Sequence, residues 1–306
     1  MSSATNVTFS AADGYLLHGT LYTPVIAGSP CAVVLINAGA GIPATYYGRF
    51  AAWLAVAGFP VLTYDYRGIG RSRPTSLRGF QASVEEWGSK DCAEALAELT
   101  RRYPGIPRVV IGHSVGCFAT GFLHDASPVA ATVFVGPHTG YYGDYARRQR
   151  PWMWLAWHLL MPLSTRMIGY FPGRRVGLPE DLPRGVALEW AARRRPDFWS
   201  NLRLPEGTPD VARHAALQQR FAAFSGPGLS IRLADDAFAT AAGEARIEAL
   251  FSGVRFEHVV IEPLATGRRA IGHFGFFRSS SREVLWPHVR DWMLAQPWAK
   301  QAHRQV

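Results

Sequence analysis

The stretch Val109-Val110-Ile111-Gly112-His113-Ser114-Val115-Gly116 decides the fold. Its apolar start is typical of a buried strand in a parallel sheet, and the apolar residues 117–119 that follow favour a helix. The pattern G-x-S-x-G therefore lies between a strand and a helix. A sharp turn at this place exposes the hydroxyl of Ser114, and the flanking glycines let neighbouring backbones approach closely. We predict that Ser114 is a nucleophile; an ordinary structural turn is the alternative.

Working outward, further short apolar runs predict more buried strands of the same sheet. They are Cys31–Ile36, Pro60–Tyr64, Arg108–Ile111, Ala130–Val135, Leu229–Leu233 and Phe256–Ile261. Apolar residues at helical spacing in Tyr46–Ala57 and Ser83–Tyr103 predict helices between strands, and an alternating pattern in Val7–Ser10 and Leu16–Tyr22 predicts an antiparallel hairpin. The expected fold class is α/β, with a mostly parallel central sheet and helices on both faces.

The alternation of strands and helices stops after Gly136. Residues 137–226 are rich in tryptophan and tyrosine and contain no strand–helix unit. A segment of this length is too long for a plain loop between two strands. We therefore expect residues 1–136 and 227–306 to form the core domain, and residues 137–226 to form an inserted helical cap.

A serine nucleophile needs a base, and the base needs an orienting acid. In this kind of sheet they follow in the order Ser, Asp or Glu, His. Asp235 and Asp236 directly follow the run Leu229–Leu233, and we choose Asp236 as the acid, with Asp235 as its neighbour or a helix cap. His273, between glycine and phenylalanine after the next strand, is the predicted base. His113 is expected to be a packing residue.

A developing oxyanion needs two N–H donors. Val115 supplies one at the start of the helix, and the second should come from the small, glycine-rich loop Ile36–Ile42 after the first parallel strand. We assign it to Gly39, with Ala40 as the alternative. An ordinary strand-to-helix turn would also explain this loop.

Taken together, these motifs resemble the α/β-hydrolase superfamily, in its branch of serine aminopeptidase-like and esterase-like proteins, and look like a bacterial subgroup of predicted hydrolases. The segment Tyr64–Ser72 is similar to the superfamily turn D-x-R-G-x-G-x-S, which implies structural roles for Asp65 and Arg67. The resemblance extends from about Ala11 to Trp292 and implies the α/β-hydrolase fold. Asn37-Ala38-Gly39 departs from the usual His-Gly pair of the oxyanion loop.

The cap is expected to select the substrate. The stretch Pro151–Met161 is apolar nearly all round, which indicates either burial against the core or an aromatic lid over a substrate pocket. On the second interpretation, Trp154 and Trp157 bind the substrate. The expected partner is then a small molecule with an apolar acyl or alkyl group of medium length.

Charge and composition limit the remaining partners. The 306 residues have a formal net charge of +9, carried almost wholly by arginine in scattered short clusters. With no nucleic-acid module visible, we expect no nucleic-acid partner. The residues up to Ser10 do not resemble a secretion signal, and no apolar run reaches the roughly 18 residues of a spanning helix. We expect no stable membrane anchor, although the aromatic stretch beside its arginines leaves transient membrane contact open.

Cysteines and metal ligands indicate no cofactor. Cys31, Cys92 and Cys117 show no CxxC spacing and favour reduced thiols in a cytoplasmic protein. No cluster of ligands suggests a metal, and Gly68-Ile69-Gly70 lacks the third glycine of a dinucleotide site. The sequence leaves the oligomeric state open.

Three functions remain in view. The first is a carboxylic-ester hydrolase that forms an acyl-enzyme on Ser114 with Asp236 and His273. The second uses the same residues for acyl transfer, or for thioester or amide hydrolysis. The third is a catalytically silent binding protein, which the complete set of three residues disfavours.

Overall fold

One eight-stranded sheet forms the centre of the molecule. The computed structural model describes residues 2–25, 29–197 and 208–302. Within these ranges the sheet order is β1-β2-β4-β3-β5-β6-β7-β8, with β1 and β2 antiparallel to their neighbours and all the others parallel. The strands are β1 (Ser2–Ser10), β2 (Leu16–Pro24), β3 (Val33–Asn37), β4 (Val61–Tyr64), β5 (Arg108–His113), β6 (Val129–Val135), β7 (Gly226–Leu233) and β8 (Val254–Ile261).

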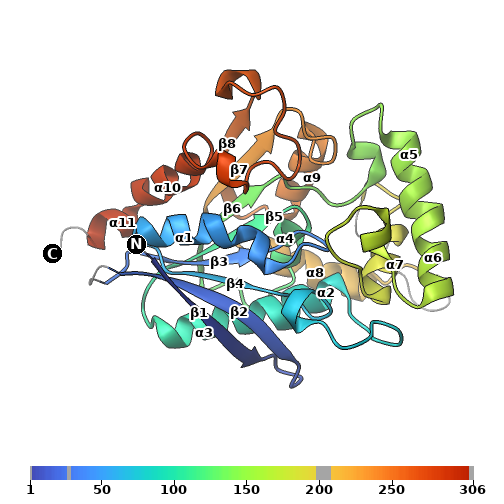
Figure 1. Ribbon diagram of the computed structural model, residues 1–306, viewed down its shortest axis with the longest axis horizontal. Helices are drawn as coiled ribbons and strands as arrows, with labels where there is room; N and C mark the ends of the chain where they lie inside the picture. The colour runs from blue at the N-terminus through green and yellow to red at the C-terminus, as the bar shows by residue number, and fades with distance from the viewer. Residues whose placement is uncertain (1, 26–28, 198–207, 303–306) are drawn as a thin grey trace.

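Helices cover both faces of this sheet, with α1 and α10 on one side and α3 on the other (Figure 1). The helices are α1 (Gly48–Val56), α2 (Val84–Glu86), α3 (Ala93–Arg102), α4 (Val115–Thr120), α5 (Arg150–Leu155), α6 (Met161–Ile168), α7 (Arg184–Ala192), α8 (Val211–Ala222), α9 (Ala241–Leu250), α10 (Trp286–Ala295) and α11 (Pro297–Ala302). Two π-helical turns, η3 (Trp87–Cys92) and η5 (Ala156–Leu160), extend α2 and α5. None of the helices in the described ranges is long and apolar enough to cross a membrane.

All the predicted strands and the hairpin are present, although β8, at the edge of the sheet, is only partly buried. The residues of β3 and β4 are buried throughout, as a strand covered on both faces must be. The hairpin strands instead alternate, so that Leu17 and Leu21 of β2 are buried while their neighbours are partly exposed. The expected α/β fold class, with a mostly parallel central sheet and helices on both faces, is therefore present.

A buried ion-pair cluster braces the edge of the sheet after β4. The carboxylate of Asp65 accepts hydrogen bonds from the backbone N–H groups of Ala44 and Arg71, at 2.7 and 3.0 Å. Arg67, itself buried, donates to Asp91 and Asp13, both at 2.7 Å. Because a buried charge is costly unless it is paired, these residues fix the turn that follows β4.

The chain between β6 and β7 divides into two parts. The helices α5, α6 and α7 gather at one end of the sheet (Figure 1), where the sequence predicts a cap. Helix α8 does not belong with them: its Phe221 packs against Phe118 and Phe122 of the core, with ring centroids 5.4 and 5.2 Å apart. Leu217, one turn earlier, is buried as well. Helix α8, which the sequence analysis includes in the expected cap, thus packs against the core, and residues 198–207 of that segment lie outside the described residues.

Candidate active site

Ser114 occupies a strained turn between β5 and α4. Its φ of 56° makes it the one non-glycine residue with a positive φ in the described part of the chain. The turn fits because its neighbours lack side chains: a Cβ at Gly116 would lie 2.2 Å from the carbonyl oxygen of Asn37, and one at Gly112 would lie 2.6 Å from Cys117. Such strain persists only where the surrounding structure holds it, and it commonly marks a functional residue.

Asp236 and His273 are brought together from two neighbouring strands. Asp236 follows β7 and His273 follows β8, and His273 Nδ1 lies 2.6 Å from Asp236 Oδ2. The other carboxylate oxygen of Asp236 accepts the N–H groups of Phe238 and Ala239. Burial alone would raise the pKa of Asp236, but the hydrogen bond and charge of His273, with those two N–H groups, hold it below its usual value. Asp236 therefore stays ionised and accepts the Nδ1 proton of His273.

Asp235 has a different position. Its carboxylate accepts hydrogen bonds from the backbone N–H of Ile271, at 2.7 Å, and of Gly272, at 3.0 Å. Asp235 thus holds the loop that carries His273, whereas its neighbour Asp236 holds the imidazole ring. The two carboxylates that the sequence leaves as alternatives contact different groups.

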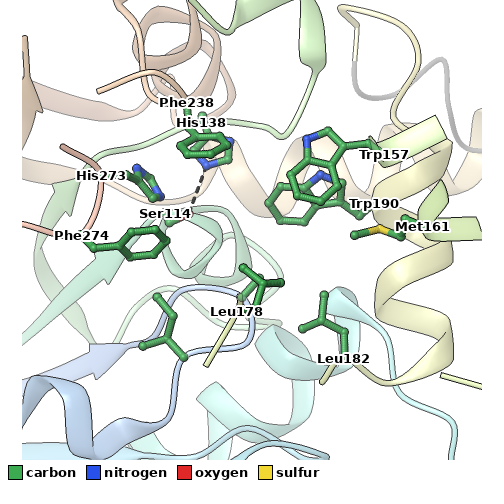
Figure 2. A pocket seen from close by; sticks show the side chains of 12 residues that line it. Ser114, His138, Trp157, Met161, Leu178, Leu182, Trp190, Phe238, His273 and Phe274 are labelled. Carbon is green, nitrogen blue, oxygen red and sulfur yellow. Dashed lines mark hydrogen bonds between the residues drawn. The ribbon is translucent and has the colours of Figure 1, made fainter. Parts of the chain in front are cut away.

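A second histidine contacts the serine. His138 Nε2 lies 3.1 Å from Ser114 Oγ, and the side chains of Ser114, His138 and His273 face one another (Figure 2). His138 is not among the residues predicted from the sequence, because the region after Gly136 is predicted as the beginning of the cap. The available signal was its place two residues after Gly136, at the carboxyl end of a parallel strand, where α/β sheets collect functional residues.

His113, expected to be a packing residue, also takes part in a buried hydrogen-bond chain. The Gly39 N–H donates to Tyr47 Oη, which lies 2.8 Å from His113 Nδ1, and His113 Nε2 lies 3.1 Å from the carbonyl oxygen of His273. Since a carbonyl only accepts, His113 carries its proton on Nε2. This chain joins the loop after β3 to the loop that carries His273.

The Gly39 N–H is therefore engaged, and this corrects the assignment of Gly39 as an oxyanion donor. One N–H has one proton, and Tyr47 Oη holds it at 2.8 Å. The next residue, Ala40, lines the pocket in front of Ser114. Val115 keeps the position that the sequence gives it, at the first residue of α4, where backbone N–H groups have no acceptor within the helix.

The pocket beside Ser114 is apolar, with a volume of about 100 Å³. Its walls come from the loops at the carboxyl ends of the strands and from the region predicted as a cap (Figure 2). They are Ala40, Ile42, Ser114, His138, Trp157, Met161, Leu178, Leu182, Trp190, Phe238, His273 and Phe274. A polar or charged substrate group would lose its hydration here with few partners to replace it.

Of the two cap tryptophans predicted to bind substrate, the structure places Trp157 in the pocket wall and Trp154 outside it. Trp154 is 45% exposed and packs its ring edge against His158. Trp157 lies within the π-helical turn η5, and Trp154 precedes it. Trp190 and Met161 line the pocket beside Trp157, and Trp154 does not.

Comparison with known families matches residues 28–193, more than half of the chain, to the family described as "Serine aminopeptidase, S33". The chain belongs to this family. A curated relative of this S33-family protein, a monoglyceride lipase homolog from monkeypox virus, is 28% identical over 115 residues. That match covers 37% of the chain and 39% of the viral protein, so the chain spans well under half of that relative's length.

Solved structures share the fold of the S33-family protein over nearly its whole length. A carboxyl esterase from Bacillus coagulans has a TM-score of 0.59 at 15% identity, covering 95% of this chain and 98% of that one. An esterase from Pyrococcus furiosus has a TM-score of 0.55 at 15% identity, covering 95% of this chain and 92% of that one. An acylaminoacyl peptidase from Pyrococcus horikoshii has a TM-score of 0.58 at 13% identity, covering 95% of this chain and 41% of that one. Because esterases and a peptidase share this fold, the fold alone does not choose the bond that is cleaved.

The first prediction separates the two aspartates. Asp236→Asn should slow the labelling of Ser114 by a fluorophosphonate by about 10³- to 10⁴-fold, because an amide no longer holds His273 in the tautomer of a base. Asp235→Asn keeps an oxygen acceptor for the loop and should slow labelling much less. Labelling rates, with thermal unfolding of each variant as the control for folding, check this. A larger loss in Asp235→Asn would contradict the assignment.

The second prediction concerns stability in acid. Burial lowers the pKa of both His113 and His138 to about 3, whereas an unfolded histidine titrates near about 6.5. Between these values only the unfolded chain takes up the protons, so stability is full above about pH 6.5 and falls as the pH drops toward 3. Each histidine should contribute about 1.4 kcal/mol per pH unit.

Urea unfolding of the wild type and of His113→Gln, at intervals from pH 7 to pH 4, measures this contribution. The slope of unfolding free energy against pH should be smaller in the variant by about 1.4 kcal/mol per pH unit, which is the contribution of one proton. Equal slopes in the two proteins would show that His113 titrates alike in the folded and unfolded states.

Proposed function

We propose that this protein is a serine hydrolase that cleaves a carboxylic ester through an acyl-enzyme on Ser114, with His273 as the base and Asp236 as its orienting acid. The observation that carries the proposal is the strained serine turn, which faces an apolar pocket beside an Asp–His pair joined at 2.6 Å. A strained serine has no structural purpose that glycine would not serve better.

The reaction runs in two halves. As Ser114 Oγ forms a bond to the carbonyl carbon, its proton passes to His273 Nε2, and the carbonyl oxygen takes the negative charge. Collapse of this intermediate breaks the bond to the alcohol, which takes the proton from His273. A water molecule then repeats the sequence on the acyl-enzyme and releases the acid. We propose that the N–H groups of Val115 and Ala40 donate hydrogen bonds to the carbonyl oxygen and stabilise its negative charge.

The acyl group of the substrate is proposed to fill the apolar pocket between the core and the cap. Trp157, Trp190 and Met161 supply its cap wall. The volume of about 100 Å³ is smaller than the roughly 150 Å³ cavity that holds a benzene molecule. We therefore place the acyl chain at the shorter end of medium length, at about four to six carbons.

The third prediction is a chain-length profile. On p-nitrophenyl esters of two to sixteen carbons, activity should peak near the length given above and should fall by at least about 10⁴-fold in Ser114→Ala. Trp157→Ala should shift the peak to longer chains, because it removes one wall of the pocket. Trp154→Ala, on the same helical segment but outside the pocket, is the matched control and should leave the profile unchanged.

Two results would redirect the proposal. Inactivity on all esters, with Ser114 still labelled by a fluorophosphonate, would favour an amide, a thioester or acyl transfer. Product analysis with an added alcohol then separates transfer from hydrolysis. Failure of the probe as well would reject the serine hydrolase itself.

We also propose that the outer face of the cap contacts anionic lipid during catalysis. Trp152, Leu163 and Met167 on α5 and α6 are 64%, 53% and 77% exposed. Residues 145–179 contain six arginines and no aspartate or glutamate. An apolar face with basic neighbours is suited to the surface of an anionic membrane. Free thiols at Cys31, Cys92 and Cys117 fit a reducing cytoplasm, which is where we place this contact.

The fourth prediction tests this contact by sedimentation with vesicles. The wild type should bind vesicles that contain phosphatidylglycerol, should bind pure phosphatidylcholine less, and should be released by salt. The double variant Leu163→Glu, Met167→Glu should bind at least about fivefold more weakly. Val260→Glu, which places one of the same charges at an exposed apolar position on β8, should bind like the wild type. Equal binding of all three proteins would reject the contact.

A further inference from the structure

His138 is a buried histidine that the mechanism above does not use, although it contacts the reacting oxygen. It lies on the loop after β6, is 2% exposed, and places Nε2 3.1 Å from Ser114 Oγ (Figure 2). His273, the proposed base, lies beside it, with ring centroids 5.5 Å apart. Two imidazoles therefore face one serine.

The hydrogen-bond partner of the other ring nitrogen identifies the tautomer of His138. The backbone N–H of Gly140 donates to His138 Nδ1 at 3.1 Å. A nitrogen that accepts a hydrogen bond carries no proton, so the neutral ring has its proton on Nε2. The His138–Ser114 contact is then a hydrogen bond that His138 donates and Oγ accepts.

The surroundings keep His138 neutral and fixed. Burial lowers its pKa to about 3, and the nearby His273 acts in the same direction; Asp236 opposes this less strongly, and Arg193 adds a still smaller lowering effect. The ring packs against Tyr145 and Trp190, with centroids 5.9 and 5.8 Å away. Arg193, just after α7, donates to the carbonyl oxygen of Thr139, the next residue, at 2.5 Å. A cap residue thus holds the loop that presents His138 to the serine.

His138 in this tautomer is unable to act as the base. A base must offer a lone pair to the serine proton. In this tautomer Nε2 of His138 already carries a hydrogen and has no free lone pair. Its Nδ1 also meets an N–H of Gly140 and not a carboxylate that would stabilise a positive ring. His273, with Asp236 on Nδ1, has the opposite arrangement.

We propose that His138 is a hydrogen-bond donor to the nucleophile: its Nε2–H occupies a lone pair of Ser114 Oγ, so that the hydroxyl proton points to His273. This inference rests on the proposed function. Negative charge develops on Oγ as its proton leaves to His273, and again when Oγ leaves the acyl group in the second half-reaction. A fixed N–H donor stabilises that charge in both steps and keeps its own proton throughout.

Two substitutions of His138 test the donor. His138→Leu removes it, and His138→Gln replaces it with an amide N–H of similar reach. His158→Leu changes another buried histidine, in the cap and outside the pocket wall, and is the matched control. For each protein we would measure kcat and KM on the best ester, the rate of fluorophosphonate labelling, the pH profile from 5 to 9, and thermal unfolding.

His138→Leu should lower kcat and the labelling rate by about 10- to 100-fold, the effect of one hydrogen bond to a developing charge, with KM within about twofold. His138→Gln should recover most of this loss. Both variants should keep the acid limb of the pH profile, because His273 remains the base. The control should behave as the wild type.

Three outcomes would overturn the inference while leaving the proposed function in place: unchanged kcat in His138→Leu, no recovery in His138→Gln, or loss of the acid limb in either variant. A wild type that neither hydrolyses esters nor reacts at Ser114 would instead reject the proposed function. If His138→Leu does not fold, ¹⁵N-histidine spectra of the wild type decide the matter. They should show His138 protonated on Nε2 and unprotonated on Nδ1, and the reverse tautomer would overturn the inference.

Discussion

The positive φ of Ser114 is the constraint on which the rest of the site depends. A non-glycine residue in this conformation costs on the order of 1–3 kcal/mol, which the surrounding structure must offset. Here the offset comes from close packing: Gly116 lets α4 approach the backbone of Asn37, and the whole of α4 is buried. The turn points the hydroxyl out of the sheet edge into the pocket. Every other polar group of the site is arranged around that fixed oxygen.

Parallel strands explain why the partners come from distant parts of the chain. Ser114, His138, Asp236 and His273 follow β5, β6, β7 and β8, which are consecutive neighbours in the sheet. Because all four strands point the same way, their carboxyl ends meet at one edge, and each contributes one side chain from the loop that follows it. Three of these residues, Ser114, His138 and His273, thereby line one pocket, and Asp236 contacts His273 from behind it.

The sequence predicts those features that depend on local pattern and fails where a feature depends on a neighbour in space. The serine turn, the strands and the loops of Asp236 and His273 follow from runs of a few residues. The sequence favours Gly39 as an oxyanion donor, but it does not show that Tyr47, eight residues later, accepts the Gly39 N–H. Trp154 and Trp157 belong to one stretch that is apolar nearly all round, so the sequence alone does not tell which of them faces the pocket. His138 required the knowledge that its loop lies against the serine.

His273 and His138 differ because of their partners, although the side chain is the same. The atom that faces Nδ1 decides what Nε2 does. The carboxylate of Asp236 accepts a proton from His273 Nδ1, so His273 Nε2 has a free lone pair and suits a base. The N–H of Gly140 gives a hydrogen bond to His138 Nδ1, so His138 Nε2 is a donor. Two buried histidines thus face Ser114 Oγ: His273, which suits a proton acceptor, and His138, which donates a hydrogen bond and keeps its proton. Burial keeps His138 neutral, so it does not oppose the positive charge that His273 would take up in the proposed reaction.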